Sequence, residues 1–275
     1  MINFSEGRQN FSKEIARSDS QIDLAKATLY IAQEEYPVLD IEKYLNALDM
    51  MAEELQERLP QTSYPLKIIQ SINQYLFDEL GFQGNTSNYY DLRNSFLNDV
   101  IDRRTGIPIS LSVIYLEVAK RIDFPMLGIG MPGHFLIRPD FEYVGIFVDV
   151  FERGEILFVQ DCEERLRQIY QQPVQLESHF LDPVKNKQIL ARMLTNLKFI
   201  YINKQELLKA IAAVERILLL FPSNQRELRD KGLLYYQLGE WVQAFQELDL
   251  YLTNFPDAED ADIIRNLLDK IKIFM

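Results

Sequence analysis

The spacing of apolar residues changes twice along this chain, and that change limits what the chain can fold into. Up to about Arg104, apolar residues recur every three or four positions, most clearly between Asp40 and Leu59, as in helices with one buried face. Between Met126 and Val159, short β-branched and aromatic runs are separated by glycine, proline and aspartate, which is typical of strands. After Asn186 the helical spacing returns. The sequence therefore predicts an α+β fold: a helical N-terminal region with a small antiparallel sheet, followed by an all-α region.

This pattern divides the chain into three parts. We expect one domain of helices and then sheet over residues 1–170. Two prolines interrupt residues 171–186, which favours a linker. Residues 187–275 form the second, helical region.

The helical region contains an internal repeat. Four residue pairs recur at an interval of 34: Phe221 with Phe255, Pro222 with Pro256, Ala210 with Ala244, and Tyr201 with Tyr235. A small residue where two helices would cross and a closing Phe-Pro resemble the tetratricopeptide repeat. A helix from about Asp257 to Ile273 is expected to cap the stack. Lys198 falls opposite Gly232, so a helical bundle with coincidental spacing is the alternative.

Composition excludes several classes of function. The formal net charge of −12 repels phosphate backbones and anionic lipid, so we expect neither nucleic acid nor a membrane as partner. One cysteine and two histidines are too few for a zinc site, and we expect no metal and no cofactor. The segment Met1–Ser20 lacks the apolar core of a signal peptide, and no apolar run is long enough to span a membrane. A reducing, cytoplasmic location is the expectation.

Four short runs between Asn94 and Asp149 carry the residue types of a thiol hydrolase. They are Asn-Ser-Phe-Leu from Asn94, Arg-Arg-Thr-Gly-Ile-Pro-Ile-Ser-Leu from Arg103, Pro-Gly-His-Phe-Leu from Pro132, and Val148-Asp149. Pro108 suits the first turn of a new helix, which is followed by a histidine on one predicted strand and an aspartate on another. In thiol hydrolases and acyltransferases a helix N-terminus lowers the thiol pKa, histidine accepts the proton and the acid orients the imidazole.

These runs resemble the SirB-type branch of the transglutaminase-like superfamily, which the C-terminal repeats also fit. The resemblance implies a Cys-His-Asp triad on a helix and an antiparallel sheet, with His134 matching the histidine and Asp149 the acid. The superfamily's Gly-x-Cys falls on Gly106-Ile107-Pro108, so a proline occupies the position of the nucleophile. Cys162 follows the acid in sequence, on a different predicted helix, and does not replace the missing thiol.

Ser110 is the residue that could restore a nucleophile. It lies in the first turn of the same helix, where backbone N–H groups favour an oxyanion. Two residues along a helix correspond to a rotation of about 200°, which need not direct Ser110 at His134. The alternative is a hydroxyl that satisfies free N–H groups at the helix start.

The other candidate residues also have two interpretations. His134 and Asp149 could form a catalytic pair or a hydrogen bond that only holds the sheet together. Arg103 and Arg104 could bind a carboxylate, although such pairs more often close a helix C-terminus.

Two hypotheses of function follow. The first is a non-catalytic transglutaminase-like protein that acts as a scaffold or adaptor and binds a protein or peptide partner through its helical repeats. The second is a hydrolase or acyltransferase that uses Ser110, His134 and Asp149. A third, weaker hypothesis is a sensor with a small-ligand pocket at His134. The missing thiol favours the first.

Overall fold

The structure, a computed structural model, describes residues 5–59, 64–141, 145–172 and 174–275. The chain separates into two compact units, Met1–Leu190 and Ala191–Met275. Each unit has its own core and is described by itself.

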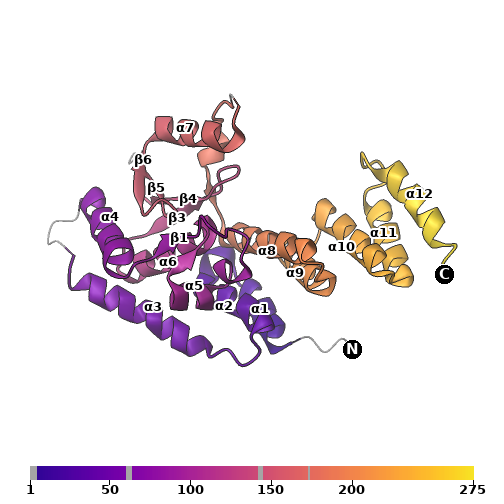
Figure 1. Ribbon diagram of the computed structural model, residues 1–275, viewed down its shortest axis with the longest axis horizontal. Helices are drawn as coiled ribbons and strands as arrows, with labels where there is room; N and C mark the ends of the chain where they lie inside the picture. Colours follow the sequence, from indigo (N-terminus) through magenta and orange to yellow (C-terminus); the bar gives the residue numbers. More distant parts are fainter. Residues whose placement is uncertain (1–4, 60–63, 142–144, 173) are drawn as a thin grey trace. The chain divides into compact units, whose positions relative to one another are not determined.

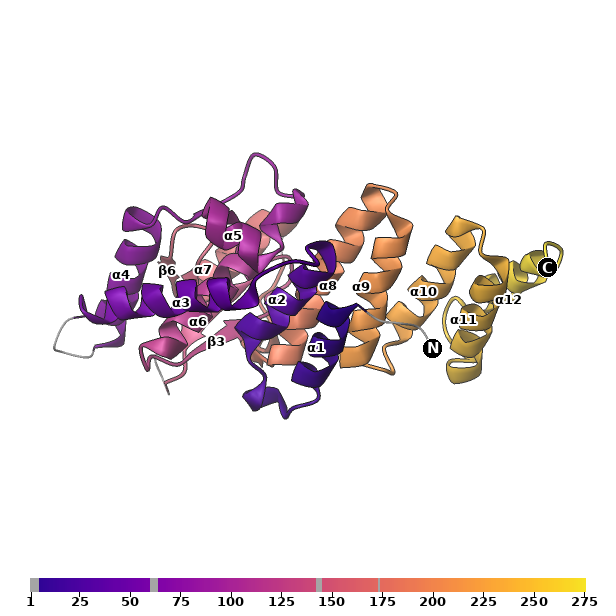
Figure 2. The same cartoon turned by 90° about the horizontal axis from the view of Figure 1, so that it is seen from below.

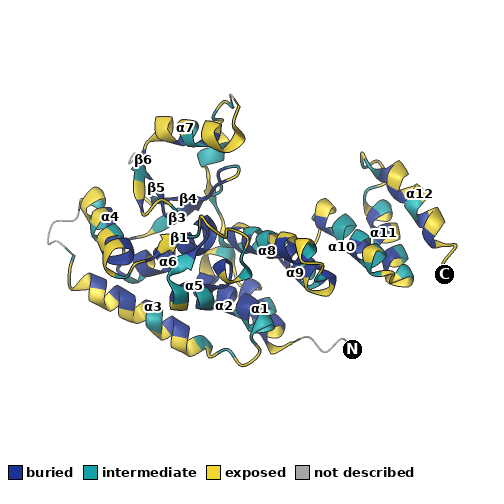
Figure 3. Ribbon diagram, in the orientation of Figure 1, coloured by how far each residue is buried: buried dark blue, intermediate teal, exposed yellow. Residues whose placement is uncertain are grey.

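Helices make up the first part of unit 1 (Figure 1). They are α1 (Glu6–Ile15), α2 (Leu24–Glu35), α3 (Ile41–Gln56), α4 (Pro65–Asn73) with a π-helical extension (Gln74–Glu79), α5 (Leu97–Arg103) and α6 (Pro108–Arg121). Helix α6 is central, because every residue from Pro108 to Ala119 is buried (Figure 3). A helix that is buried on all sides has no polar face, which matches the apolar content of this segment.

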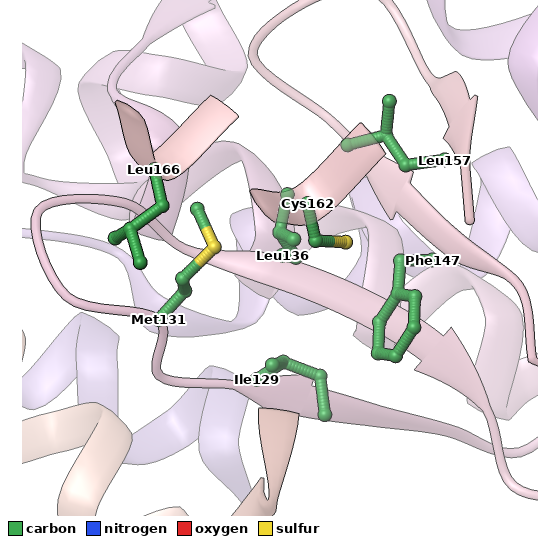
Figure 4. Close-up of a cluster of buried hydrophobic side chains, with 7 residues drawn as sticks. All are labelled: Ile129, Met131, Leu136, Phe147, Leu157, Cys162 and Leu166. Atoms are coloured by element: carbon green, nitrogen blue, oxygen red, sulfur yellow. The ribbon is translucent and has the colours of Figure 1, made fainter. Parts of the chain in front are cut away.

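A five-stranded antiparallel sheet completes unit 1. Its strands are β3 (Met126–Ile129), β4 (Leu136–Pro139), β5 (Phe147–Asp149), β6 (Glu155–Leu157) and β7 (Pro183–Val184), in the order β6-β5-β4-β3-β7. Helix α7 (Val159–Tyr170) follows β6 and directs Cys162 and Leu166 at an apolar cluster formed by the sheet and the turn before β4 (Figure 4). The fold class expected from the sequence is confirmed.

Two elements differ from the expectations. The region up to about Arg104 was expected to be helical, but its last helix, α5, begins only at Leu97, after a single 3-10 turn (Leu92–Asn94). The side-chain amide of Asn94, which is completely buried, donates to the carbonyls of Asn88 and Tyr89 and so stabilises a loop in place of the first helical turns. Strand β7 lies within residues 171–186, where a linker was expected.

Further short elements were not expected at all. Strands β1 (Gln83–Gly84) and β2 (Thr105–Gly106) form a small parallel pair. A 3-10 turn (Asp19–Gln21) precedes α2, and another (Ser178–Leu181) precedes β7.

Unit 2 shows the repeat in its helix boundaries. The helices are α8 (Asn186–Asn203), which begins in unit 1, α9 (Leu207–Leu220), α10 (Gln225–Leu238), α11 (Trp241–Asn254) and α12 (Ala261–Ile271), and α9 to α12 follow one another in a row (Figure 2). Helix α11 begins and ends 34 residues after α9. The residues Gln205 and Gly239, also 34 apart, both have left-handed backbone angles after the first helix of a repeat.

The interior of unit 2 explains where the repeat deviates. A Cβ atom at Gly232 would lie 2.6 Å from Leu248, so α10 and α11 cross closely there. At the equivalent position, Lys198 is buried and its Nζ lies 2.7 Å from Glu227 and 3.0 Å from Asp230 of α10. A buried ion pair between successive first helices therefore occurs where the other repeat has a close helix crossing.

Helix α12 differs from α10 on the face that corresponds to the contact of α10 with α11. In α10, the positions that pack on α11 include Leu228, Lys231, Gly232 and Tyr235. The residues 34 positions later are polar and exposed: Asp262, Arg265, Asn266 and Asp269. Because the surface that would receive a following helix is polar, α12 can face water there.

Candidate functional site

His134 and Asp149 meet at the edge of β4 and β5. His134 Nε2 lies 2.8 Å from Asp149 Oδ2, and both residues are buried. The other carboxylate oxygen, Oδ1, accepts hydrogen bonds from the N–H groups of Phe151 and Glu152. His134 lies in the turn before β4 and not on the strand, because Gly133 adopts a left-handed conformation with φ of 73°. The carboxylate is thus fixed by its own turn and holds the imidazole in one orientation.

A third residue, Arg165 of α7, belongs to this site. Its Nη1 lies 3.5 Å from Asp149 Oδ2, the same oxygen that His134 contacts. Its Nη2 donates to Glu155 at 2.5 Å, and Nη1 lies 3.8 Å from Glu152. Sequence reasoning missed Arg165. Helical spacing places it beside the buried Cys162 and Leu166, but no motif connects it to Asp149.

Ser110 lies in the first turn of α6 and is completely buried. Its Oγ donates to the Asn94 carbonyl at 2.5 Å and accepts from the Ile107 N–H at 3.1 Å. The hydroxyl therefore forms hydrogen bonds with main-chain groups of two segments, one before α5 in the sequence and one after it. The structure brings His134 and Asp149 together. Among the described residues, the hydrogen-bond partners of Ser110 are Asn94 and Ile107, and neither His134 nor Asp149 is one of them.

The only cysteine is no better placed for nucleophilic chemistry. Cys162 is completely buried in the apolar cluster beneath α7. Burial, reinforced by the nearby carboxylates of Asp161 and Asp149, raises the pKa of its thiol to about 12. At neutral pH the thiol is protonated, and the thiolate is the reactive form.

The two arginines singled out in the sequence contact neighbouring segments. Arg103 Nη1 lies 3.4 Å from Asn94 Oδ1, and Arg103 also faces Asp91 at 3.9 Å. Arg104 ends α5 in a left-handed conformation and donates to the Leu80 carbonyl, with its guanidinium over the Phe82 ring. Both side chains are engaged in holding the segments around α5 together.

Aromatic rings border the histidine. The rings of His134 and Phe151 lie edge to face, with their centroids 6.4 Å apart. The ring centroids of Tyr89 and Phe151 are 6.1 Å apart. Tyr90, which contacts Tyr89, is 59% exposed. These rings lead from the buried pair to the surface of unit 1, a feature that the sequence did not reveal because Tyr89 and Phe151 are distant in the chain.

The described residues provide neither a metal-binding cluster nor a membrane-spanning helix. Within them, no group of three or more histidine, cysteine, aspartate or glutamate side chains is arranged to hold a metal ion. No helix in the described part of the chain combines the length and apolar character needed to cross a bilayer.

Two family models match the chain. The model described as transglutaminase-like superfamily matches residues 42–195, and the model described as tetratricopeptide repeat matches residues 197–269. The two matched ranges cover most of unit 1 and most of unit 2.

Similar proteins occur in bacteria and mammals. A UPF0162 protein of Xylella fastidiosa (strain 9a5c) is 38% identical over 91% of this chain and 90% of its own length. A UPF0162 protein of Vibrio cholerae is 27% identical over 71% of this chain and 72% of its own length. Human F-box only protein 21 is 29% identical over 83% of this chain, but the match covers 36% of that protein. No solved structure matches the chain.

Proposed function

The chain belongs to the transglutaminase-like superfamily and carries C-terminal tetratricopeptide repeats, and from this premise we propose that it is a non-catalytic adaptor that binds a partner protein through the repeats. Within the superfamily we assign it to the SirB-type branch, on the runs that begin at Arg103 and Pro132. We also propose that it works in a reducing, cytoplasmic compartment, since its single cysteine forms no disulfide.

The observation that carries this proposal is a row of apolar side chains in phase with the repeat. Phe199, Leu233 and Leu267 lie on the first helices of successive repeats, 34 residues apart. Phe199 is 50% exposed, whereas Leu233 and Leu267 are half-buried and also pack against the core of unit 2. Ile263, one helical turn before Leu267, is 69% exposed and extends the row.

The row continues onto α12, although α12 has become polar where a following helix would pack. The exposed apolar residue Ile263 therefore lies outside the face of α12 on which a following helix would pack. Contiguous exposed apolar side chains on a soluble protein mark interaction sites, and repeat arrays bind partners along such surfaces. The partner that fits is a peptide segment with several apolar side chains.

The site in unit 1 supports a role without catalysis. The Ser110 hydroxyl is buried against main-chain groups, and the Cys162 thiol is protonated. Asp149 shares one oxygen between His134 and the cation of Arg165, so part of its charge is neutralised before it acts on the imidazole.

Affinity capture with the full chain tests the adaptor role. The wild type should retain a stoichiometric partner, and the variant Ile263→Glu should lose it, because a charge would then lie in the apolar row on a side chain that is 69% exposed. Val242→Glu is the matched control, since Val242 is 49% exposed on α11, outside the row. Equal retention by both variants, or no stoichiometric partner, would contradict the proposal.

A hydrolase or acyltransferase that uses Ser110, His134 and Asp149 is the second candidate, and the preformed His134–Asp149 contact favours it. It requires the Ser110 hydroxyl to leave the Asn94 carbonyl. Purified wild type should then hydrolyse small ester or amide substrates, and both Ser110→Ala and His134→Ala should abolish turnover. Activity that survives either substitution would eliminate this candidate.

A further inference from the structure

Helix α7 is attached to unit 1 through little apolar surface. Only two residues of α7, Cys162 and Leu166, are buried. In α6, by contrast, every residue from Pro108 to Ala119 is buried. The sheet separates α7 from α6 (Figure 1). Segments with few buried apolar contacts open at a lower free energy than the whole domain unfolds. The packing of α7 is therefore that of an element able to detach locally.

The surface beneath α7 includes the His134 site. A Cβ atom at Gly133 would lie 2.7 Å from Ile169 Cγ2, so the last turn of α7 packs directly on the backbone next to His134. Cys162 points from α7 into the same layer (Figure 4). His134 is 8% exposed and Cys162 is 0% exposed, so both side chains are shielded from solvent while α7 is in place.

The polar attachment of α7 to the strands depends on Arg165. This arginine contacts Asp149 at the end of β5 and Glu155 on β6. Arg167, two residues later on the same helix, instead pairs with Glu163 and Glu164 of α7 itself. An ion pair to a fully buried carboxylate is costly to break, because the charge of Asp149 would lose a partner without gaining full solvation.

We propose that α7 is a cover that opens while the rest of unit 1 stays folded, and that Arg165 locks it shut by binding Asp149. The His134–Asp149 pair then serves as the receiving half of the lock. Asp149 is held by its turn and by His134, in the position where Arg165 reaches it. The imidazole of His134 meets solvent or a ligand only when α7 moves away. This role goes beyond the adaptor function and does not depend on it.

The single cysteine provides a direct measure of the opening. We would follow labelling of Cys162 in the full chain with the thiol reagent 5,5′-dithiobis(2-nitrobenzoic acid) at increasing urea below the unfolding transition. A locally opening cover predicts slow labelling with a weak dependence on urea. Arg165→Ala should label about ten- to hundredfold faster, which is the range for losing a hydrogen-bonded charge pair. Arg165→Lys should restore part of the protection, and Arg167→Ala, the matched control, should label like the wild type.

The two histidines provide an independent readout. Diethyl pyrocarbonate should modify His134 faster in Arg165→Ala, in proportion to the labelling of Cys162. His179, with its side chain 62% exposed, is the internal reference whose rate should not change. Labelling that follows global unfolding, or equal rates for Arg165→Ala and Arg167→Ala, would overturn the proposal. Fast labelling of Cys162 with an unchanged rate at His134 would also overturn it, because the helix would then not cover the histidine.

Discussion

At the scale of single residues, Ser110 joins separate segments of unit 1 through one hydroxyl group. Its Oγ donates to the Asn94 carbonyl and accepts from the Ile107 N–H, in surroundings closed to water. Asn94 in turn uses its side chain to hold the loop before α5, through Asn88 and Tyr89. The hydroxyl satisfies main-chain groups that would be expensive to bury unpaired.

We expect Ser110→Ala to lower the free energy of unfolding by about 1–3 kcal/mol, because the buried Asn94 carbonyl loses its donor. Urea unfolding followed by circular dichroism measures this loss. Ser112→Ala is the control on the same helix. Ser112 is equally buried, but its hydroxyl has no hydrogen-bond partner among the described residues, so its removal should be close to neutral. Equal losses in the two variants would contradict a structural role for the Ser110 hydroxyl.

Cys162 predicts a dependence of stability on alkaline pH. Burial raises the pKa of its thiol from 9.0 to about 12 in the folded protein. Between these values the unfolded chain releases the proton and the folded chain retains it, so stability falls as the pH rises from about 9 towards 12. The decline should be shallower in Cys162→Ala than in the wild type, in urea titrations at a series of pH values. Identical slopes would show that the thiol does not contribute.

At the scale of elements, the start of α8 depends on a residue far away in the chain. Asp19 accepts hydrogen bonds from the N–H groups of Asn186 and Lys187, each at 3.0 Å. The Asn186 side chain donates back to the Asp19 carbonyl. A carboxylate at a helix N-terminus satisfies free donors and interacts favourably with the helix dipole. The first turn of α8, which lies in unit 1, is thereby fixed to the segment between α1 and α2.

Asp19→Ala should therefore lower the free energy of unfolding by about 1–2 kcal/mol, since it removes both acceptors at the start of α8. Asp19→Asn, which keeps one acceptor oxygen but no charge, should lose less. Unfolding of each variant by heat or urea, compared with unfolding of the wild type, measures the two losses. A loss in Asp19→Asn as large as in Asp19→Ala would show that the one remaining acceptor oxygen contributes nothing without the charge and the second oxygen.

At the scale of the whole molecule, each of the two units has its own interior, and that of unit 2 contains a buried ion pair. Unit 1 is built around the buried helix α6, whereas in unit 2 the buried Lys198 contacts the buried Glu227 and the half-buried Asp230. Removing one partner of a buried ion pair leaves an uncompensated charge, which is strongly destabilising. A change in this cluster should therefore act on the repeats first.

We expect Lys198→Met to destabilise the repeats by about 3–5 kcal/mol, because Glu227 would remain buried without its cation. Hydrogen exchange on the full chain should show lost protection in residues 191–275 and unchanged protection in α6. The double variant Lys198→Met/Glu227→Met should recover part of the loss, since it buries no unpaired charge. Equal loss of protection in α6 would mean that the units do not open separately.

Much of the fold could be predicted from the sequence. The spacing of apolar residues located α3, α6 and four strands of the larger sheet, and the 34-residue interval located the helix pairs of unit 2. The short strands β1, β2 and β7 could not be predicted, because each has two residues, which are too few to show a period. The delayed start of α5 depends on Asn94, whose side chain can stabilise a loop or continue a helix with equal ease locally.

The candidate site was predictable only in part. His134 and Asp149 could be paired because each lies on or beside a predicted strand and the strands are neighbours along the chain. Whether Ser110 faced the site could not be predicted, since its orientation is decided by the carbonyl of Asn94. Arg165 gave no signal, because an arginine on the polar side of an amphipathic helix is ordinary until its partner is known.

The sequence by itself determined which segments form helices or strands and which of their faces are apolar, because the helix and strand periods are properties of the backbone. It also determined the family, the repeat and the absence of a thiol at Pro108. Only the tertiary structure decided the partners of the polar side chains: Ser110 with Asn94, Asp19 with α8, and Arg165 with Asp149. Such contacts act over a few ångströms between segments that can be more than a hundred residues apart, and local spacing carries no information about that distance.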